Sequence, residues 1–215
     1  FSYMSTGSAY VKKKAKKKVF VICPFPQGVA AGQRLKYEQY FDHWSENGYE
    51  ITVSSFMDMS MWNVVYTRGN YGLKIMGTMR GYFRRLLDIF RVRRFDLVYV
   101  SLWVTPLGTS FFERLFRQLS RRLIYDIEDN LLMEKGNNLN PFVKLLKSRK
   151  KTEHLIRTAD HVITSSSFLN DYCLEWNRKK VCTFISSSVD TDRFFPLNNY
   201  ANTRKVTIGW TGTFS

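Results

Sequence analysis

Short apolar runs alternate along the chain with segments in which apolar residues recur every three or four positions. The runs are typical of strands buried on both faces of a sheet and occupy residues 19–23, 51–55, 97–101, 122–126, 161–165, 182–186 and 206–210. The helical spacing occupies residues 37–44, 81–95, 111–120, 140–159 and 168–176. Residues 56–75 show no clear period. The alternation predicts an α/β fold with a Rossmann-like, doubly wound parallel sheet.

One edge of such a sheet is expected to bind ligands, because ligands lie outside the carboxyl ends of the parallel strands. The loops at that edge would be residues 24–34, 101–109, 126–132, 165–168, 186–190 and 211–215.

The composition indicates a folded, basic protein. The chain is 44% hydrophobic and 16% aromatic, which argues against disorder, and its formal net charge is +15. The lysine-rich run at 12–18 supplies six of these charges and leaves +9 on the remaining residues. We interpret residues 1–17 as a basic tail or an expression remnant. The remaining charge indicates an anionic partner, which could be a nucleic acid, an acidic membrane surface or a phosphorylated substrate.

The cysteine and histidine content predicts neither a disulfide framework nor a metal site. Three cysteines occur without a C-x-x-C pair, and the three histidines lack metal-ligand spacing. No apolar stretch is long enough to span a bilayer. We therefore expect no metal and a cytoplasmic location, with attachment to the inner face of the plasma membrane as a further expectation.

The first loop, "PFPQGVAAGQR", lacks the G-x-G-x-x-G fingerprint of dinucleotide-binding proteins. It is a turn of small residues that leads into a helix, with Arg34 in the first turn. This arrangement suits a phosphate group. The alternative is an ordinary strand-to-helix turn with Arg34 in solvent.

Three carboxylates follow the fourth strand in "YDIEDN". Strand alternation places Asp126 and Glu128 on the same side, and Asp129 begins the loop. They could bind sugar hydroxyls, act as a base or hold a cation, or Asp126 could cap the next turn while the others are solvated. The pair Asp190 and Asp192 forms a D-x-D pattern, but its place before a Phe–Pro break favours a turn or helix cap.

The helix expected at 81–95 combines an apolar stripe with a basic flank. The stripe contains Phe83, Leu86, Leu87 and Phe90, and the arginines expected to face a membrane are Arg84, Arg85 and Arg91. This pattern is typical of a helix at a membrane interface. The alternative is a helix packed on the core with a solvated basic face.

Six segments, in order, resemble the N-terminal half of retaining GT-B glycosyltransferases of family GT4, which act in bacterial surface polysaccharide synthesis. They are "GQRLKYEQYFDHWSENGYEITVSSF", "FDLVYVSLWVTPLG", "RRLIYDIEDN", "ADHVITSSSFLNDYC", "ISSSVDTDRFFP" and "IGWTGTFS". The resemblance implies that 18–200 is the acceptor-side domain of such an enzyme. It also implies that 201–215 is a linker and the first strand of a second domain that is otherwise absent.

The resemblance also implies roles for individual residues. Glu128 and Asp129 would lie near the acceptor hydroxyl as catalytic residues. The residues expected to bind acceptor or phosphate are Gly32, Arg34, Ser101 and Asp126, and those of the donor-side loop are Thr211, Gly212 and Thr213. Some relatives carry a histidine base where this chain has Ser101, so such a base is not expected here.

We therefore interpret the chain as the acceptor-binding half of a glycosyltransferase. The full enzyme would move a sugar from a nucleotide-sugar to a lipid-linked or polysaccharide acceptor, without a metal. The resemblance implies that this chain alone cannot transfer sugar, since the residues that hold the donor lie in the second domain. The alternative is a non-catalytic Rossmann-like module whose basic surface binds nucleic acid or an anionic membrane. For the enzyme we expect no nucleic-acid partner.

Overall fold

The fold is built on one parallel sheet of six strands. The computed structural model describes residues 16–128, 149–192 and 194–195. The strands run in the order β2-β1-β3-β4-β5-β6, and every neighbouring pair is parallel. Their bounds are β1 Lys17–Cys23, β2 Tyr49–Ser55, β3 Leu97–Ser101, β4 Leu123–Ile127, β5 His161–Thr164 and β6 Cys182–Phe184. This sheet confirms the predicted α/β, Rossmann-like, doubly wound fold.

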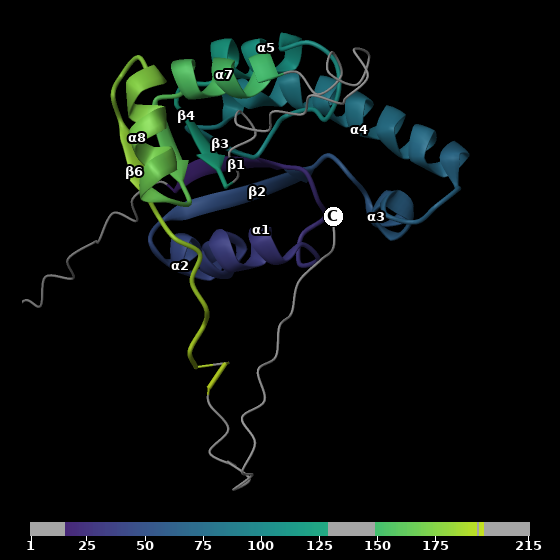
Figure 1. Ribbon diagram of the computed structural model, residues 1–215, viewed down its shortest axis with the longest axis horizontal. Coiled ribbons are helices and arrows are strands. Elements are labelled where there is room, and N and C mark those ends of the chain that lie inside the picture. The colour runs from purple at the N-terminus through teal and green to yellow at the C-terminus, as the bar shows by residue number, and fades with distance from the viewer. Residues whose placement is uncertain (1–15, 129–148, 193, 196–215) are drawn as a thin grey trace, which may run out of the picture.

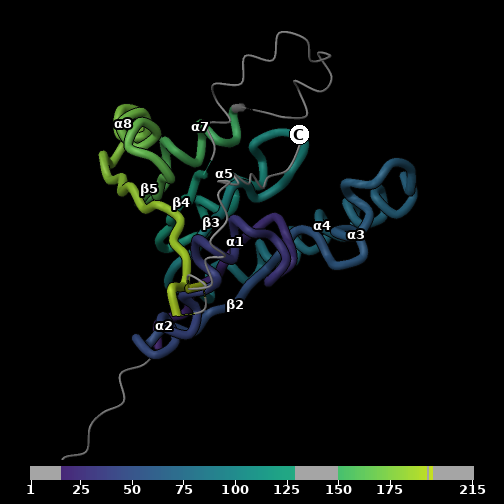
Figure 2. Tube along the Cα trace, turned by 60° about the horizontal axis from the view of Figure 1, so that its bottom comes forward, coloured from purple at the N-terminus to yellow at the C-terminus, as the bar shows by residue number. Residues whose placement is uncertain are grey.

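Helices cover both faces of the sheet (Figure 1). On one face lie α1 Ala31–Lys36, the 3₁₀ turn η1 Glu38–Tyr40 and α2 Phe41–Glu46. The other connections lie on the opposite face and comprise α4 Tyr71–Arg91, η2 Val92–Arg94, α5 Phe111–Leu119, α7 Arg149–Thr158 and α8 Ser167–Trp176. The short helix α3 Met59–Val65 packs against α4. Helix α3 and the N-terminal half of α4 lie together to one side of the sheet (Figure 2).

Alternate residues of the strands divide the apolar core between the two faces. Phe20 and Ile22 of β1 point towards the side of α5 and α7, where the larger cluster forms. Val19, Val21 and Cys23 point towards α1 and α2. A strand buried on both faces is continuously apolar, which is why β1 was recognisable in the sequence.

The helices differ from the prediction in three places. The helix expected at 37–44 is broken at Tyr37, whose φ of −137° leaves the helical region, so α1 ends before it and α2 begins after η1. Residues 56–75, for which no element was predicted, contain α3 and the first turn of α4. The helix expected to begin at residue 81 begins at Tyr71. The remaining expectations for 140–148 and 206–210 lie outside the described residues.

Helix α4 turns glycines and charged residues inward. Gly77 and Gly81 are buried, and Arg85 and Asp88 are 0% and 1% exposed. The prediction that Arg85 faces a membrane is therefore wrong. Its guanidinium lies 3.0 Å from the Asp88 carboxylate and donates to main-chain carbonyl groups of the sheet, which satisfies a charge that would otherwise be costly to bury.

The contact of Gly81 with Phe56 provides a test of this packing. A Cβ atom at residue 81 would lie 2.5 Å from Cζ of the buried Phe56 ring. We expect Gly81→Ala to lower the free energy of unfolding by about 1–3 kcal/mol, because an overpacked core outweighs the better helix propensity of alanine. Urea denaturation measures this change.

The matched control is Gly72→Ala in the same helix, where a Cβ atom would have no neighbour within 4 Å. It should leave stability unchanged or raise it by up to about 1 kcal/mol. Equal effects of the two substitutions would show that Phe56 does not lie against residue 81.

Candidate functional site

The candidate site lies where the chain changes face. From β1 the chain passes to α1 on one face, whereas from the adjacent strand β3 it passes to α5 on the other. The carboxyl ends of β1 and β3 are neighbours, since Ile22 pairs with Val100. A crevice for a ligand opens at such a point in doubly wound sheets.

Side chains of α1 and η1 fix the loop that follows β1. Gln33 is 2% exposed. Its amide accepts from the N–H of Phe25 at 3.0 Å and donates to the carbonyl of Phe25 at 3.1 Å. Glu38 accepts from the Gln33 amide at 3.0 Å and from the N–H of Gly28 at 2.9 Å. Because these contacts satisfy main-chain groups at both ends of the turn, the loop has a defined shape without the glycine-rich fingerprint.

Gly32 lies against the carboxylate of Glu128. A Cβ atom at residue 32 would be 2.8 Å from Oε2 and 3.4 Å from Oε1 of Glu128. The absence of a side chain at Gly32 therefore lets this carboxylate approach the α1 backbone closely. The Ser165 hydroxyl donates to the Glu128 carbonyl and links this residue to the end of β5. Two residues singled out separately in the sequence thus meet in the structure.

Asp126 faces the same helix but is buried. Its carboxylate is 1% exposed, lies 2.5 Å from Nζ of Lys36 and accepts a hydrogen bond from the Tyr99 hydroxyl. Burial raises the pKa of Asp126, and the charge of Lys36 opposes that shift. The structure confirms that Asp126 and Glu128 share a side, but it corrects the binding role expected for Asp126. That carboxylate is an ion-pair partner within the fold.

The end of β3 lies on the other side of the candidate site. Ser101 is 3% exposed and lies beside Tyr37 under α1, so its expected contact with acceptor or phosphate is also corrected. The next residue, Leu102, has φ +59°, a left-handed conformation that is unfavourable for a side chain with a Cβ atom. Its N–H donates to the Asp126 carbonyl at 2.9 Å, and this bond holds the strained turn at the edge.

The remaining predicted residues divide into three groups. Arg34 is exposed at the edge, as either reading of the first loop required. The Asp190 carboxylate accepts from the N–H of Asp192 at 3.0 Å, which confirms the interpretation of D-x-D as a turn. The residues outside the described part of the chain are Asp129, Thr211, Gly212 and Thr213.

Of the arginines expected to face a membrane, Arg84 is half-buried and donates to the Ser55 carbonyl at 2.6 Å. Arg91 remains half exposed, with its guanidinium 3.8 Å from the Asp88 carboxylate.

Three residues that position the site were not singled out in the sequence: Gln33, Lys36 and Glu38. A signal was available for two of them. Gln33 and Lys36 precede Tyr37 and Tyr40 at intervals of three to four residues, so they continue the period of the aromatic stripe towards the N-terminus. Polar residues in register with a buried stripe indicate buried polar side chains with partners.

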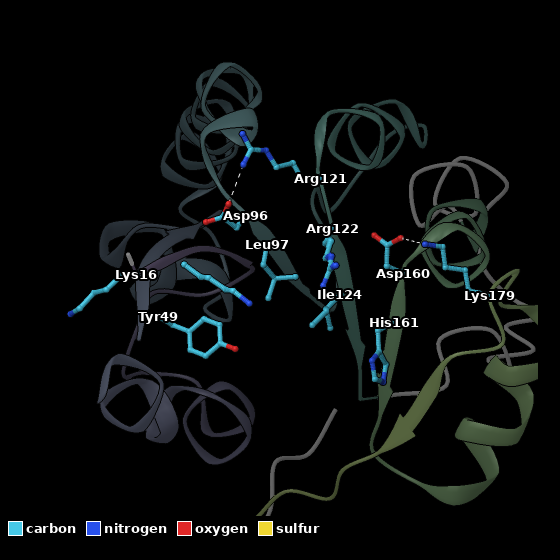
Figure 3. A pocket seen from close by; sticks show the side chains of 11 residues that line it. Lys16, Tyr49, Asp96, Leu97, Arg121, Arg122, Ile124, Asp160, His161 and Lys179 are labelled. Carbon is cyan, nitrogen blue, oxygen red and sulfur yellow. Dashed lines mark hydrogen bonds and ion pairs between the residues drawn. The ribbon is translucent and has the colours of Figure 1, made fainter. Parts of the chain in front are cut away.

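A cavity of about 960 Å³ lies at the opposite edge, where the strands begin (Figure 3). Its floor includes Leu97, Ile124 and His161 of three adjacent strands. Basic side chains dominate its wall, and its two carboxylates, Asp96 and Asp160, are paired with Arg121 and Lys179. Because a doubly wound sheet binds its substrate at the carboxyl ends, this cavity is separate from the candidate site.

Within 16–128, 149–192 and 194–195, no three histidine, cysteine, aspartate or glutamate side chains gather closely enough to hold a metal ion. No helix in those ranges is both long and apolar enough to cross a membrane.

The buried ion pair gives a pH-dependent test. Lys36→Met leaves the Asp126 carboxylate buried without its cation, so we expect a loss of about 3–5 kcal/mol in the free energy of unfolding at neutral pH. The folded-state pKa of Asp126 lies above its unfolded value and rises further in the variant. The folded state therefore gains relative stability as the pH falls through that raised pKa, and the deficit should be smaller near pH 5 than near pH 8.

Urea denaturation at both pH values measures this difference. The control Lys36→Met with Asp126→Asn removes the unpaired charge, so its deficit near pH 8 should be smaller than that of the single variant and should not grow between pH 5 and pH 8. A deficit of the single variant that is equal at both pH values would contradict burial of the ionised Asp126.

Scans against protein-family models and against curated proteins found no match. Among solved structures, the chain is similar to an alpha-glucosyltransferase in complex with UDP and a 13-mer DNA containing a central A:G mismatch. The identity is 12% and the TM-score 0.43, over 82% of this chain and 42% of that chain. This chain thus spans less than half of the length of that enzyme.

Proposed function

We propose that this chain is the acceptor-binding half of a retaining glycosyltransferase with a GT-B fold, similar to family GT4. The single observation that carries the proposal is the Glu128 carboxylate at the carboxyl edge of the sheet, close to the Gly32 backbone where β1 and β3 send the chain to opposite faces. Its support from the sequence is the order of the six segments that resemble this family.

Glu128 is suited to hold an acceptor hydroxyl. Its backbone follows β4 directly and is tied to Ser165, so the carboxylate is carried by the rigid part of the sheet. A carboxylate oxygen accepts a hydrogen bond from a sugar hydroxyl and so orients that oxygen towards the reacting carbon. Asp129, the next residue, is proposed to share this role. Arg34, exposed on the same helix as Gly32, is proposed to contact phosphate.

In the proposed reaction the acceptor oxygen forms a bond to the anomeric carbon of the donor. The bond between that carbon and the phosphate oxygen breaks, and the sugar keeps its anomeric configuration. The hydroxyl proton passes to the departing diphosphate, so Glu128 positions the acceptor without accepting the proton permanently. Thr211, Gly212 and Thr213 are proposed to lie near the donor phosphates. No resident metal is required.

The nucleotide-sugar is proposed to bind mainly to a second domain. The acceptor is proposed to be a lipid-linked or polysaccharide glycan of bacterial surface synthesis, met at the cytoplasmic side of the plasma membrane. The described domain alone is not expected to transfer sugar.

A transfer assay with the full-length protein tests the proposal. Radiolabelled nucleotide-sugars are offered with a lipid extract of the producing cells, and the labelled glycolipid is counted. We expect Glu128→Gln to lower kcat by up to about 10²-fold with little change in the KM of the donor, because a neutral amide orients the acceptor hydroxyl less strongly than the carboxylate does. Glu46→Gln changes an exposed acid of α2 and serves as the control.

Full activity of Glu128→Gln would remove this residue from the mechanism. Absence of transfer from every donor would contradict the enzyme proposal.

Gly32→Ala tests the position of the same carboxylate without changing its charge. The added Cβ atom would lie 2.8 Å from Oε2, so Glu128 must move. A displacement of about 1 Å can cost up to about 10²-fold in rate, so we expect kcat to fall about 10–100-fold while the fold remains stable. Gly72→Ala, at an open position of α4, should retain full activity. Equal turnover of Gly32→Ala and Gly72→Ala would show that the contact with residue 32 does not position Glu128.

A further inference from the structure

Helix α4 is amphipathic in the reverse of the usual sense. The face turned to the protein carries Gly77, Gly81, Arg85 and Asp88, all of which are buried. The face turned outward carries large apolar side chains, here called the outer stripe, that are between 46% and 73% exposed. The outer stripe consists of Ile75, Met76, Met79, Phe83, Leu86, Leu87 and Phe90. At 100° per residue these side chains occupy one side of the helix over its whole length.

Helix α4 cannot rotate about its axis to bury the outer stripe. The two glycines allow Met61 and Phe56 to approach the α4 backbone closely. Arg85 makes hydrogen bonds of 2.8 to 3.2 Å with Val104, Ser54 and Cys23, and an ion pair with Asp88. Rotation of the helix to bury its apolar side would break all of these contacts. The outer stripe is therefore a fixed feature of the surface.

The outer stripe is continued on α5. Tyr82 of α4 donates to the Leu107 carbonyl at 2.6 Å and its ring packs beside Phe112. The adjoining Phe111 is 58% exposed and Leu107 is 39% exposed. Monomeric soluble proteins rarely leave a contiguous apolar patch of this extent uncovered, so the patch indicates a binding surface.

Basic side chains border this patch. Arg80 and Arg91 lie along one side of the outer stripe, and their side chains are 54% and 50% exposed. Helices α4, α5 and α7 precede strands β3, β4 and β5. Their last turns therefore lie at the edge of the sheet where the strands begin. The basic residues of a groove of about 770 Å³ at that edge are Arg114, Arg117, Arg121, Arg157, Arg178 and Lys179. Helices α4, α5 and α7 lie in one layer over the sheet (Figure 1), so this layer carries both the apolar and the cationic groups.

The basic side chains around the outer stripe indicate which kind of partner binds there. Two copies of this chain that paired through their outer stripes would bring like charges together, in a protein whose net charge is already +15. An anionic lipid surface instead supplies acyl chains for the outer stripe and phosphate groups for the arginines. We propose that α4 docks the protein on an anionic membrane, with the outer stripe inserted among the lipids and the flanking arginines at the headgroups.

The structure thereby changes the membrane contact expected from the sequence. Arg85 belongs to the core of the fold, Arg84 is held by the end of β2, and the inserted groups are the apolar side chains that had the spacing of a buried stripe. This docking does not depend on sugar transfer, and its assay needs no sugar substrate.

Sedimentation with lipid vesicles tests the proposal. We expect the wild-type chain to sediment with vesicles of phosphatidylcholine and phosphatidylglycerol, and much less with phosphatidylcholine alone. Phe83→Asp with Phe90→Asp should weaken binding at least about tenfold, because two inserted rings are replaced by charges that the anionic surface repels. Both positions are exposed, so circular dichroism and thermal unfolding should be those of the wild type. The control Phe168→Asp alters an equally exposed ring on α8 and should bind as the wild type does.

Charge is tested separately with Arg80→Glu and Arg91→Glu. Each removed arginine should weaken binding to the anionic vesicles roughly fivefold or more, and added salt should reduce binding of the wild type. Equal binding to neutral and anionic vesicles would overturn the role of the arginines. Equal binding of the wild type and the double phenylalanine variant would overturn the role of the outer stripe. A wild-type chain that stays in the supernatant but forms dimers that Phe83→Asp disrupts would assign the surface to a second copy.

Discussion

The guanidinium of Arg85 joins the ends of β1 and β2, the loop after β3 and helix α4 at one buried point. It donates to the carbonyl groups of Cys23, Ser54 and Val104 and pairs with Asp88 on its own helix. Removal of water from such a charge is costly, and only this complete set of partners offsets the cost. The position of α4, the end of β1 and the loop after β3 are therefore fixed together. Both the candidate site and the outer stripe depend on this arrangement.

Among the described residues, the candidate site combines a rigid frame with the half-buried acid Glu128. Asp126, Lys36 and Tyr99 satisfy one another in the interior, so their effect on a ligand is indirect: they hold α1 against β4. Glu128, two residues further along, emerges at the edge over Gly32. A cluster of acids after a strand can thus contain one member that stabilises the fold and another that faces a ligand. Asp126 and Glu128 point to the same side because they are two residues apart along the chain. They differ because Asp126 meets Lys36 at the last residue of α1, whereas Glu128 meets Gly32 in its first turn.

The sheet was predictable because strands covered on both faces are continuously apolar, and each of the six described strands coincides with such a run. The positions of Asp126 and Glu128 near the carboxyl edge of the sheet followed from the same pattern. The orientation of α4 was not predictable from spacing, because its apolar side has the period of a core-packed helix while its glycines and Arg85 make the inner contacts. Those contacts need Phe56, Met61 and Ser54, which lie far away in the sequence. The role of Glu38 was hidden because it holds the first loop through a main-chain N–H, a group that nearly every residue carries.

The segment that leaves β6 returns to the first helix. The Ser188 N–H donates to the Leu35 carbonyl at 3.4 Å, and the Gln39 amide donates to the Ser188 carbonyl at 3.2 Å. These bonds attach one of the last described stretches of the chain to α1, on which Gly32 lies. A pull on that stretch would be transmitted through Leu35 to the helix and would change its separation from Glu128. The chain that follows β6 is thereby coupled to the geometry of the candidate site.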